Sequence, residues 1–194
     1  MTNTAPFINP CHTIMSDNFA TFTDPISVIL SNAIYGDVVV LDIDATVLFQ
    51  SIQHNNTSGI DPNPHGIEVY MLCIQYNIPV FFVTARVQTQ NNIEKTVEHL
   101  KSMGLDKYTG LYMRPADITW WAQISQFKAN VRRQIAQQAT ILLNVGDMWS
   151  DVHETHDDTI LSTLQQQSGN LHVLFMTNLP ETAIWALKLA ESRP

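Results

Sequence analysis

The chain has 194 residues, of which 45% are hydrophobic and 14% are charged, enough for one globular domain but short for two. Its formal net charge of −8, with only 10 lysines and arginines and no basic cluster, argues against nucleic acid or an anionic membrane surface as a main partner. No stretch approaches the roughly 20 apolar residues of a membrane span, and the N-terminal segment lacks the pattern of a secretory signal. We therefore expect a cytoplasmic protein, and the sequence leaves an extracytoplasmic location and a homodimer open.

Residues 1–23 are rich in Thr, Asn and Pro without a period, and they predict an irregular N-terminal arm before a single domain over residues 24–194. The pair Asp24-Pro25 is typical of the start of a helix, which would end at Gly36. The side chains of this helix that we expect to face inward are Ile26, Leu30, Ala33 and Ile34.

A strand over residues 38–43 follows, and its unbroken apolar run indicates burial on both faces. Residues 49–64 are polar and predict a loop, a small insert that is too short for a separate cap domain. Beyond this insert, we expect helices over residues 67–76, 90–104, 121–138 and 181–190, and strands over residues 78–86, 110–115, 140–147 and 171–176. This alternation predicts an α/β fold with a mainly parallel central sheet.

Apolar spacing assigns an inward face to three of these helices, and Gly104 is the expected C-cap of the second. The residues expected to face inward are Ile67, Met71 and Ile74, then Ile93, Val97 and Leu100, and then Ile124, Phe127, Val131 and Ile135.

Polar side chains gather where the predicted strands end. These residues are Asp42, Asp44 and Thr46 after the first strand, Thr84 and Arg86 after the second, and Asn144, Gly146 and Asp147 after a later one, with Lys128 in the preceding helix. In open parallel sheets the ligand crevice lies beyond the carboxyl ends of the strands. The sequence therefore predicts one site at this edge of the sheet.

Converging carboxylates repel one another, which raises their pKa values unless a cation is present. A hard ion such as Mg²⁺ fits best, with Asp42 and Asp147 as ligands and water completing the coordination. Thr84, Lys128 and the free backbone N–H groups after Asp42 are donors suited to the oxygens of a phosphoryl group.

Four short motifs also carry a resemblance to a known family. The segment "DIDAT" resembles motif I, DxDx[T/V], of the haloacid dehalogenase (HAD) superfamily, and "VFFVTAR" resembles motif II. Lys128 in "QFKANVRRQI" resembles motif III, and "NVGDMWSD" resembles motif IV. The whole is most similar to the subfamily IIIB acid phosphatases, which include plant vegetative storage proteins, and the resemblance covers residues 38–151 and extends toward residue 180.

The resemblance implies a three-layer α/β/α Rossmann-like HAD fold with a minimal cap, and Mg²⁺-dependent hydrolysis of phosphomonoesters through an aspartyl-phosphate. It implies that Asp42 is the nucleophile and that Asp44 is the general acid and base. The phosphate-binding residues it implies are Thr84, Ala85 and Lys128, and the metal-binding residues are Asp42, Asp44 through its carbonyl, Asp147 and Asp151. The substrate would be a small phosphomonoester or a phosphorylated macromolecule.

Motif I commonly has glycine where this chain has Ala45, and a methyl group would crowd the turn if φ were positive there. A catalytically weak or inactive phosphate-binding, metal-binding or storage-type protein is therefore the alternative. A signalling receiver domain, which also places Asp, Thr and Lys around Mg²⁺ on a parallel sheet, is disfavoured because its phosphoacceptor follows a later strand.

Several further residues have two possible roles. Arg86 would either bind substrate or cap the following helix, and a disulfide between Cys11 and Cys73 is left open. For the tryptophans, packing in the core or cleft wall is expected for at least two of the three, with stacking on substrate as the alternative; they are Trp120, Trp121 and Trp149. The candidates for the site rim are His54, Asn55 and Asn56, and a solvated segment is favoured over a metal site at His153 and His156.

Overall fold

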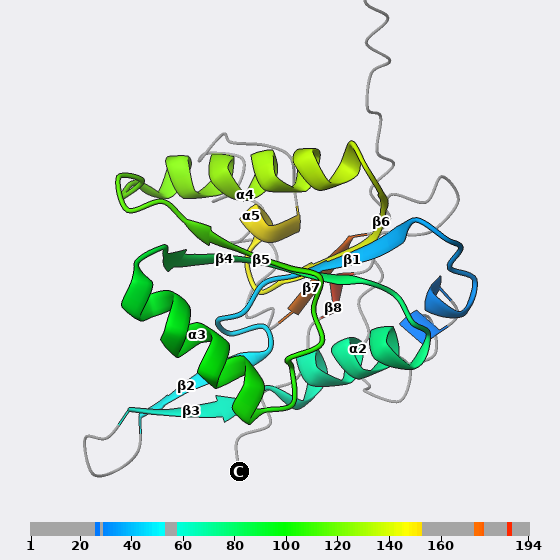
Figure 1. Ribbon diagram of the computed structural model, residues 1–194, viewed down its shortest axis with the longest axis horizontal. Coiled ribbons are helices and arrows are strands. Elements are labelled where there is room, and N and C mark those ends of the chain that lie inside the picture. Colours follow the sequence, from blue (N-terminus) through cyan, green and yellow to red (C-terminus); the bar gives the residue numbers. More distant parts are fainter. Residues whose placement is uncertain (1–25, 28, 53–57, 153–172, 177–185, 188–194) are drawn as a thin grey trace, which may run out of the picture.

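The structure is a computed structural model that describes residues 26–27, 29–52, 58–152, 173–176 and 186–187. Six strands form one sheet in the order β5-β4-β1-β6-β7-β8 (Figure 1). The parallel strands are β1 (Asp37–Leu41), β4 (Val80–Val87), β5 (Gly110–Arg114) and β6 (Thr140–Gly146). The antiparallel strands at the edge beside β6 are β7 (Val173–Met176) and β8 (Ala186–Leu187).

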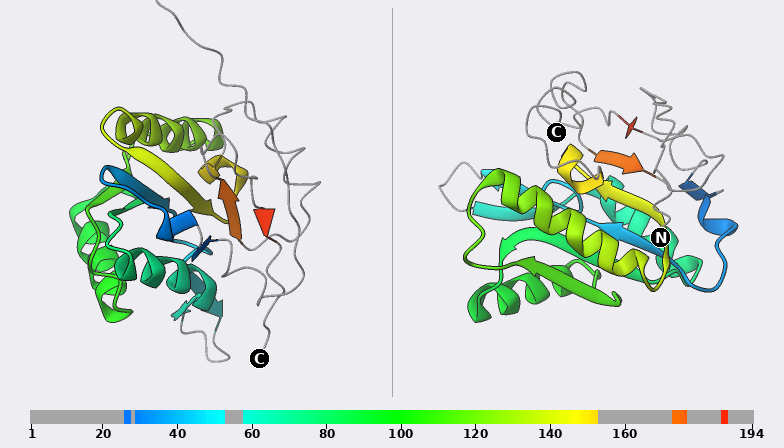
Figure 2. Two further views of the ribbon diagram at one scale, coloured as in Figure 1. Left: turned by 90° about the vertical axis from the view of Figure 1, so that its right-hand side faces the viewer. Right: turned by 90° about the horizontal axis from the view of Figure 1, so that it is seen from above.

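Helices cover both faces of this sheet, so the fold has three layers (Figures 1 and 2). On one face lie α4 (Trp121–Ala136) and the short α5 (Trp149–Val152), and on the other lie α2 (Pro64–Gln75) and α3 (Gln90–Ser102). The predicted α/β/α architecture with a mainly parallel sheet is confirmed. None of the helices in the described ranges combines the length and the apolar character that a membrane crossing requires.

β1 lies within the sheet, between β4 and β6, and is buried along its whole length. Val39 and Leu41 pack in an apolar cluster with residues of α2 and α3, whereas Val38 and Val40 pack in a second cluster with residues of α4. Successive side chains of a strand point to opposite faces, so both faces of β1 require apolar residues. The prediction of a strand covered on both sides is confirmed.

The inward face of α2 differs from the predicted one. Its fully buried side chains are Val69, Tyr70 and Cys73, whereas Met71 is 52% exposed. Apolar residues occur around most of this helix, so their spacing alone does not select the inward face. The Tyr70 hydroxyl accepts the backbone N–H of Lys107 at 2.7 Å, which ties this face to the chain ahead of β5.

The inward face of α3 also differs, because a polar residue occupies it. Thr96 and Leu100 are buried in α3, whereas Val97, expected inward, is exposed. The Thr96 hydroxyl has a hydrogen-bond partner inside the fold, described below, which offsets the free-energy cost of burying a polar group. Gly104 follows the end of α3 with φ of 73°, the left-handed conformation that commonly ends a helix.

The segment predicted as a loop over residues 49–64 forms a hairpin instead. β2 (Leu48–Ile52) pairs antiparallel with β3 (Ser58–Pro62) in a separate two-stranded sheet. The loop prediction rested on polarity, but main-chain hydrogen bonds hold such a ribbon, and it needs no continuous apolar face. The hairpin projects beside the lower end of α3 in Figure 1 and occupies the place of the predicted small insert.

Two predicted helices differ near the ends of the chain. Helical residues at 26–27 and 29–31 show a shorter first helix, and Ile34 is exposed rather than inward. The Ile34 backbone N–H donates to Asp37 Oδ2 at 2.7 Å, which turns the chain into β1. Ala186 and Leu187, expected in a closing helix, instead pair with β7 at the sheet edge, which satisfies their backbone groups. The N-terminal arm and Cys11 lie outside the described residues, and Cys73 is buried and free.

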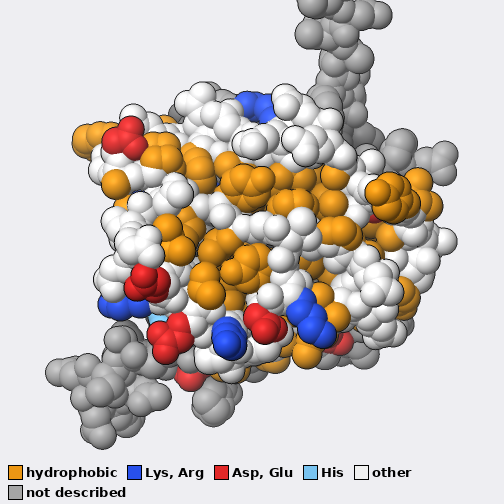
Figure 3. All heavy atoms as spheres, viewed as in Figure 1, with side chains coloured by type: hydrophobic (Ala, Val, Ile, Leu, Met, Phe, Trp, Pro, Cys, Tyr) orange, Lys and Arg blue, Asp and Glu red, His pale blue; other side chains and the backbone are white. Residues whose placement is uncertain are grey.

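Figure 3 shows hydrophobic side chains gathered over the face that carries β5, and charged side chains gathered over α3. Trp120 and Trp121 are 75% and 42% exposed, so these two residues do not pack in the core. Their packing in a cleft wall stays a prediction. They stand where the chain leaves a loop and enters α4, outside the layer between helix and sheet. The side chain of Trp149 lies outside the described part of the structure.

Candidate active site

The carboxyl ends of β1, β4 and β6 lie side by side, because these strands are parallel neighbours in the sheet. Asp42 follows β1, Thr84 lies near the end of β4, and Asp147 follows β6. The backbone N–H of Asp42 still pairs with the sheet and donates to the carbonyl of Val145 at 2.9 Å. Residues more than 100 positions apart in the chain therefore meet at one edge of the sheet, as predicted.

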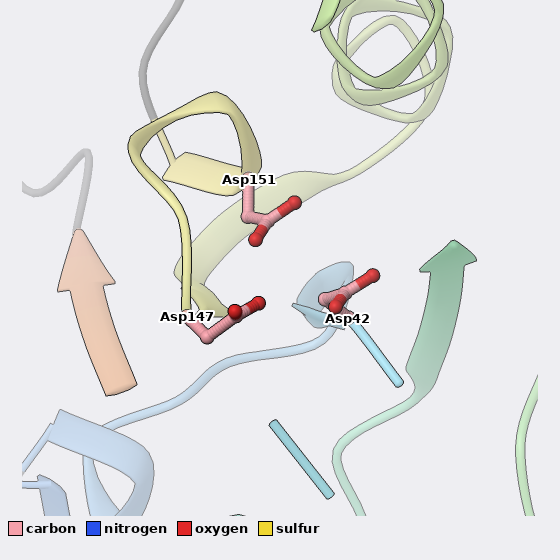
Figure 4. Close-up of side chains that lie close together, drawn as sticks. All are labelled: Asp42, Asp147 and Asp151. Atoms are coloured by element: carbon pink, nitrogen blue, oxygen red, sulfur yellow. The ribbon is translucent and has the colours of Figure 1, made fainter. Parts of the chain in front are cut away.

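Three aspartates form a compact cluster at this edge. Asp42, Asp147 and Asp151 each offer a carboxylate oxygen, and these oxygens lie within 4.8 Å of one another. Figure 4 shows the three side chains entering one space from the end of β1, the segment after β6, and α5. Asp42 and Asp151 are buried and Asp147 is partly buried, so water screens their charges poorly.

Lys128, on the buried side of α4, places its ammonium group among these carboxylates. Its Nζ donates to Asp42 Oδ1 at 2.8 Å and to Asp151 Oδ1. Burial alone would lower the pKa of Lys128, but the attraction of Asp151 and Asp42 outweighs burial and raises it. Lys128 is therefore charged throughout the physiological pH range.

Burial and mutual repulsion raise the pKa values of two of the three carboxyl groups. The pKa of Asp42 is raised to about 7, mainly by burial. Attraction to Lys128 lowers this pKa, whereas repulsion from Asp151 and Asp44 raises it further. Burial also raises the pKa of Asp147 to about 8, together with repulsion from Asp151 and Asp42. The cluster therefore holds protons near neutral pH that a bound cation would displace.

The donor set of this cluster fits a hard divalent cation such as Mg²⁺. Carboxylate oxygens are the protein ligands that Mg²⁺ prefers, and the ion usually keeps several of its waters. When all three aspartates are ionised, three carboxylates around one ammonium leave a formal charge of −2, which a divalent cation would offset. The residues placed to hold it are Asp42, Asp147 and Asp151.

Asp151 reaches the cluster because the chain turns tightly between β6 and α5. A Cβ atom at Gly146 would lie 2.1 Å from the Cβ of Asp151, so only glycine allows this approach. Asp151 Oδ2 accepts the backbone N–H of Met148 at 3.0 Å. Arg132 Nη1 donates to the carbonyls of Ser150 at 3.1 Å and Asp151 at 2.8 Å, which fixes α5 against α4.

The turn after β1 presents Asp42 and Asp44 and contains one strained residue. Ala45 has φ of 60°, a left-handed conformation that costs about 1–2 kcal/mol for a residue with a side chain. Its backbone N–H donates to the carbonyl of Leu48 at 2.7 Å, and its own carbonyl accepts Asn63 Nδ2 at 3.3 Å. The turn therefore closes with alanine in place of glycine, held by hydrogen bonds on both sides.

β4 leaves its regular pairing with β5 after Thr84, because the register shifts between Thr84 and Val87. Arg114 on β5 donates Nε to the carbonyl of Ala85 at 2.8 Å and so fixes this bulge. The buried Thr84 hydroxyl accepts the backbone N–H of Arg86 at 3.2 Å. A hydroxyl that accepts in this way still has its own proton to donate, which suits the phosphate-binding role predicted for Thr84.

Asp44, the predicted general acid and base, is held by Arg86 in a bidentate ion pair. Arg86 Nε and Nη2 donate to Asp44 Oδ2 at 2.9 Å and Oδ1 at 2.7 Å, and Nη1 donates to Thr96 Oγ1 at 3.2 Å. Of the two roles expected for Arg86, capping of the following helix is wrong, because Thr89 caps α3 by accepting the backbone N–H of Asn92. Substrate binding by Arg86 stays a prediction.

The predicted site residues thus divide into two groups. The residues in or beside the carboxylate cluster are Asp42, Lys128, Asp147 and Asp151, with Thr84 and Ala85 at the end of the neighbouring strand. The carboxylate of Asp44 is not part of the Asp42, Asp147 and Asp151 cluster, and the role of its carbonyl as a metal ligand stays a prediction. The residues outside the described part of the chain are His54, Asn55, Asn56, His153 and His156.

Four supporting residues were missed from the sequence, namely Asn63, Thr96, Arg114 and Arg132. Each acts on a partner in another element of the fold, so local spacing carries no signal for three of them. Arg132 was the exception, because it follows Lys128 by one helical turn and therefore shares its buried face.

A comparison with protein families agrees with this geometry. The family model described as HAD superfamily, subfamily IIIB (acid phosphatase) matches residues 53–178. The match spans Thr84, Lys128 and the Asp147–Asp151 segment, whereas Asp42 and Asp44 lie just before it. No curated protein is similar enough to the chain to count as a match.

The raised pKa values give the metal-free protein a specific pH dependence. Asp42 and Asp147 have folded-state pKa values of about 7 and about 8 against an ordinary 3.8, so the folded state binds more protons between these limits. The contribution of these two carboxyl groups to the free energy of unfolding is fully present below about pH 4 and is lost as the pH rises through 7 to 8. Unfolding by urea in a chelator should therefore give a lower free energy of unfolding at about pH 8 than at about pH 5.

Asp147→Asn is the control for this prediction, because it removes one of the two titrating carboxyl groups and should flatten the pH dependence. Mg²⁺ should stabilise the wild-type protein more at about pH 8 than at about pH 5, since the ion binds the deprotonated carboxylates. A free energy of unfolding that rises steadily across this range in the chelator would contradict the raised pKa values.

Replacing Ala45 by glycine tests the strain in the turn. Glycine adopts the left-handed conformation freely but loses more chain entropy on folding, so we expect Ala45→Gly to stabilise the protein by about 0.5–1 kcal/mol. Ala136→Gly, near the exposed end of α4, has no such strain to relieve and should give no gain. Urea unfolding measures the free energy of unfolding of both variants. A loss of stability in Ala45→Gly would show that the turn does not need a positive φ.

Proposed function

Because the chain belongs to subfamily IIIB of the HAD superfamily, the acid phosphatases, we propose that it hydrolyses phosphomonoesters with Mg²⁺ through an aspartyl-phosphate on Asp42. The observation that carries this proposal is the environment of Asp42 itself. Its carboxylate is buried, accepts a hydrogen bond from the Lys128 ammonium, and lies in a cluster suited to a divalent cation. Such a carboxylate is aligned in advance, and the ammonium offsets the charge of an approaching phosphate.

In the first half of the reaction, an Asp42 oxygen attacks the phosphorus and the bond from phosphorus to the ester oxygen breaks. The leaving oxygen takes a proton from the Asp44 carboxyl group and departs as an alcohol. Lys128 and the Thr84 hydroxyl offset the charge on the phosphoryl oxygens, and each such donor supplies on the order of 2–4 kcal/mol of transition-state stabilisation.

In the second half, Asp44 is a carboxylate and takes a proton from water as the water oxygen attacks the phosphorus. The acyl bond between Asp42 and phosphorus then breaks, which releases inorganic phosphate and returns both aspartates to their starting states. Splitting one displacement into two lets the same pair of carboxyl groups serve both steps.

Asp42, Asp147 and Asp151 would hold the metal ion. When bound, Mg²⁺ supplies Lewis-acid and template chemistry, offsetting the repulsion between an anionic carboxylate and an anionic phosphate. Gly146 and Arg132 contribute by fixing Asp151 in reach of the cluster.

The cap supports a broad substrate range, a small phosphomonoester or a phosphorylated macromolecule. Among the described residues, the segment between the turn after β1 and α2 supplies only the β2–β3 hairpin. A single two-stranded ribbon covers less of a site than a cap domain does, so large leaving groups retain access to the site.

One observation favours a second function, a phosphate-binding or metal-binding protein with little or no turnover. Ala45 strains the turn that must present Asp42 and Asp44 together. Binding of a fluoride complex of Mg²⁺ without turnover of any phosphoester in a broad panel would favour this alternative over catalysis.

Asp42→Asn tests the catalytic proposal, with p-nitrophenyl phosphate as substrate and Mg²⁺ supplied or removed. Loss of the nucleophile should lower kcat by on the order of 10³-fold or more. The fold should persist, because the amide has the shape of the carboxyl group and adds no charge.

Asp106→Asn is the matched control, because Asp106 is exposed and lies in the segment between α3 and β5, outside the site. It should keep wild-type turnover. Wild-type rates in Asp42→Asn, or full activity of the wild-type protein in a chelator, would overturn the proposal.

A further inference from the structure

We propose that Arg86 is a positioning residue that holds Asp44 in place for proton transfer, and that Thr96 is the anchor that holds Arg86. This inference rests on the proposed function of Asp44. It adds to the site two residues that are not among the catalytic positions of the four motifs. It concerns the leaving group of the substrate, because only the first half of the reaction uses Asp44 as an acid.

The contacts of Arg86 use three of its nitrogen atoms. Nε lies 2.9 Å from Asp44 Oδ2 and 3.2 Å from Asp44 Oδ1, and Nη2 lies 2.7 Å from Asp44 Oδ1. Nη1 lies 3.2 Å from Thr96 Oγ1. The planar guanidinium is therefore fixed at both ends, and it fixes the plane of the carboxylate in turn.

This pair differs from an ordinary surface ion pair in its burial and in its supports. The Arg86 side chain is only 17% exposed, and Thr96 is buried. A buried threonine on the inward face of a helix needs a partner for its hydroxyl, and Arg86 is that partner. An exposed ion pair would lose side-chain entropy without such an anchor and would hold its partner weakly.

The backbone of β4 is shaped to deliver Arg86 to Asp44. The register shift after Thr84 takes Ala85 and Arg86 out of the ladder with β5. Arg114 holds the carbonyl of Ala85, and the Thr84 hydroxyl accepts the backbone N–H of Arg86. In a regular strand, successive side chains point to opposite faces of the sheet. The bulge breaks this alternation and changes the direction of the Arg86 side chain.

Asp44 needs such support because it directly precedes a turn, where it pairs with Leu48 in an isolated bridge, and its side chain is partly exposed. A free aspartate in this position would sample several rotamers, and displacement of a catalytic group by about 1 Å can cost on the order of 10²-fold in rate. The two oxygens have lone pairs beyond those that face Arg86, so the ion pair does not block proton transfer.

A direct contact between Arg86 and the substrate phosphate would also make Arg86 important, but by a different route. Loss of a phosphate contact raises KM and weakens inhibition by inorganic phosphate to the same extent for every substrate. Loss of the position of Asp44 instead slows substrates whose leaving oxygen needs a proton and spares those whose leaving group departs as a stable anion. The dependence on leaving group therefore separates the two roles.

The experiment measures kcat/KM, which reports the transfer of the phosphoryl group to Asp42, for dinitrophenyl phosphate, p-nitrophenyl phosphate and glycerol phosphate. Arg86→Gln should lower kcat/KM on the order of 10²-fold for glycerol phosphate and less than about 3-fold for dinitrophenyl phosphate. Arg86→Lys should recover little, because an ammonium cannot reproduce the two-pronged contact. Arg133→Gln, which removes an exposed arginine of α4, is the matched control and should leave both rates unchanged.

Thr96→Val and Thr96→Ser keep the test valid if the Arg86 variants fail to fold. Valine has the shape of threonine without the hydroxyl. Thr96→Val should show the same dependence on leaving group, with a loss in kcat/KM that is roughly a tenth of the loss in Arg86→Gln. Serine keeps the hydroxyl and should behave as wild type. Thermal unfolding of each variant checks that the fold persists.

Equal losses across all three substrates in the variants, or a rise in KM alone with weaker phosphate inhibition, would overturn the positioning role. Absence of any turnover by the wild-type protein, even of dinitrophenyl phosphate with Mg²⁺, would overturn the proposed function instead. The two failures are therefore distinguishable in one set of measurements.

Discussion

Repulsion among three carboxyl groups, two of them buried and one partly buried, is the constraint on which this site depends. Asp42, Asp147 and Asp151 lie within 4.8 Å of one another, and the Lys128 ammonium offsets only part of their charge. A fold accepts such an arrangement only where packing enforces it, and here parallel strands and a buried helix face do so. Under the proposed function, the same arrangement that destabilises the metal-free protein would favour the binding of a divalent cation and of an anionic phosphate.

Backbone irregularities place the side chains of this site. Ala45 is held in a left-handed conformation so that the chain can turn between Asp42 and the hairpin, and a bulge in β4 redirects Arg86 toward Asp44. Gly146 removes a side chain so that α5 can approach β6. Regular strands place the residues near one edge, and these departures from regularity give each side chain its final direction.

The sequence predicted what depends on periodicity and motif order, and it failed where a distant partner decides. The parallel sheet and the position of Asp42 at a strand end followed from unbroken apolar runs. The inward face of α3 did not, because Thr96 turns inward to meet Arg86 of strand β4. The polar sequence of the β2–β3 hairpin predicts a loop, because main-chain pairing leaves no pattern in a polar sequence.

The central claim is that Asp42 carries the phosphoryl group, and trapping that intermediate tests it most directly. Borohydride reduces an acyl phosphate, so adding it during turnover of a phosphomonoester with Mg²⁺ converts a phosphorylated aspartate into homoserine. Peptide mass spectrometry should then find homoserine at position 42 in the wild-type protein, and none when substrate is omitted. Steady turnover with an unmodified Asp42, or homoserine at another aspartate, would contradict the account.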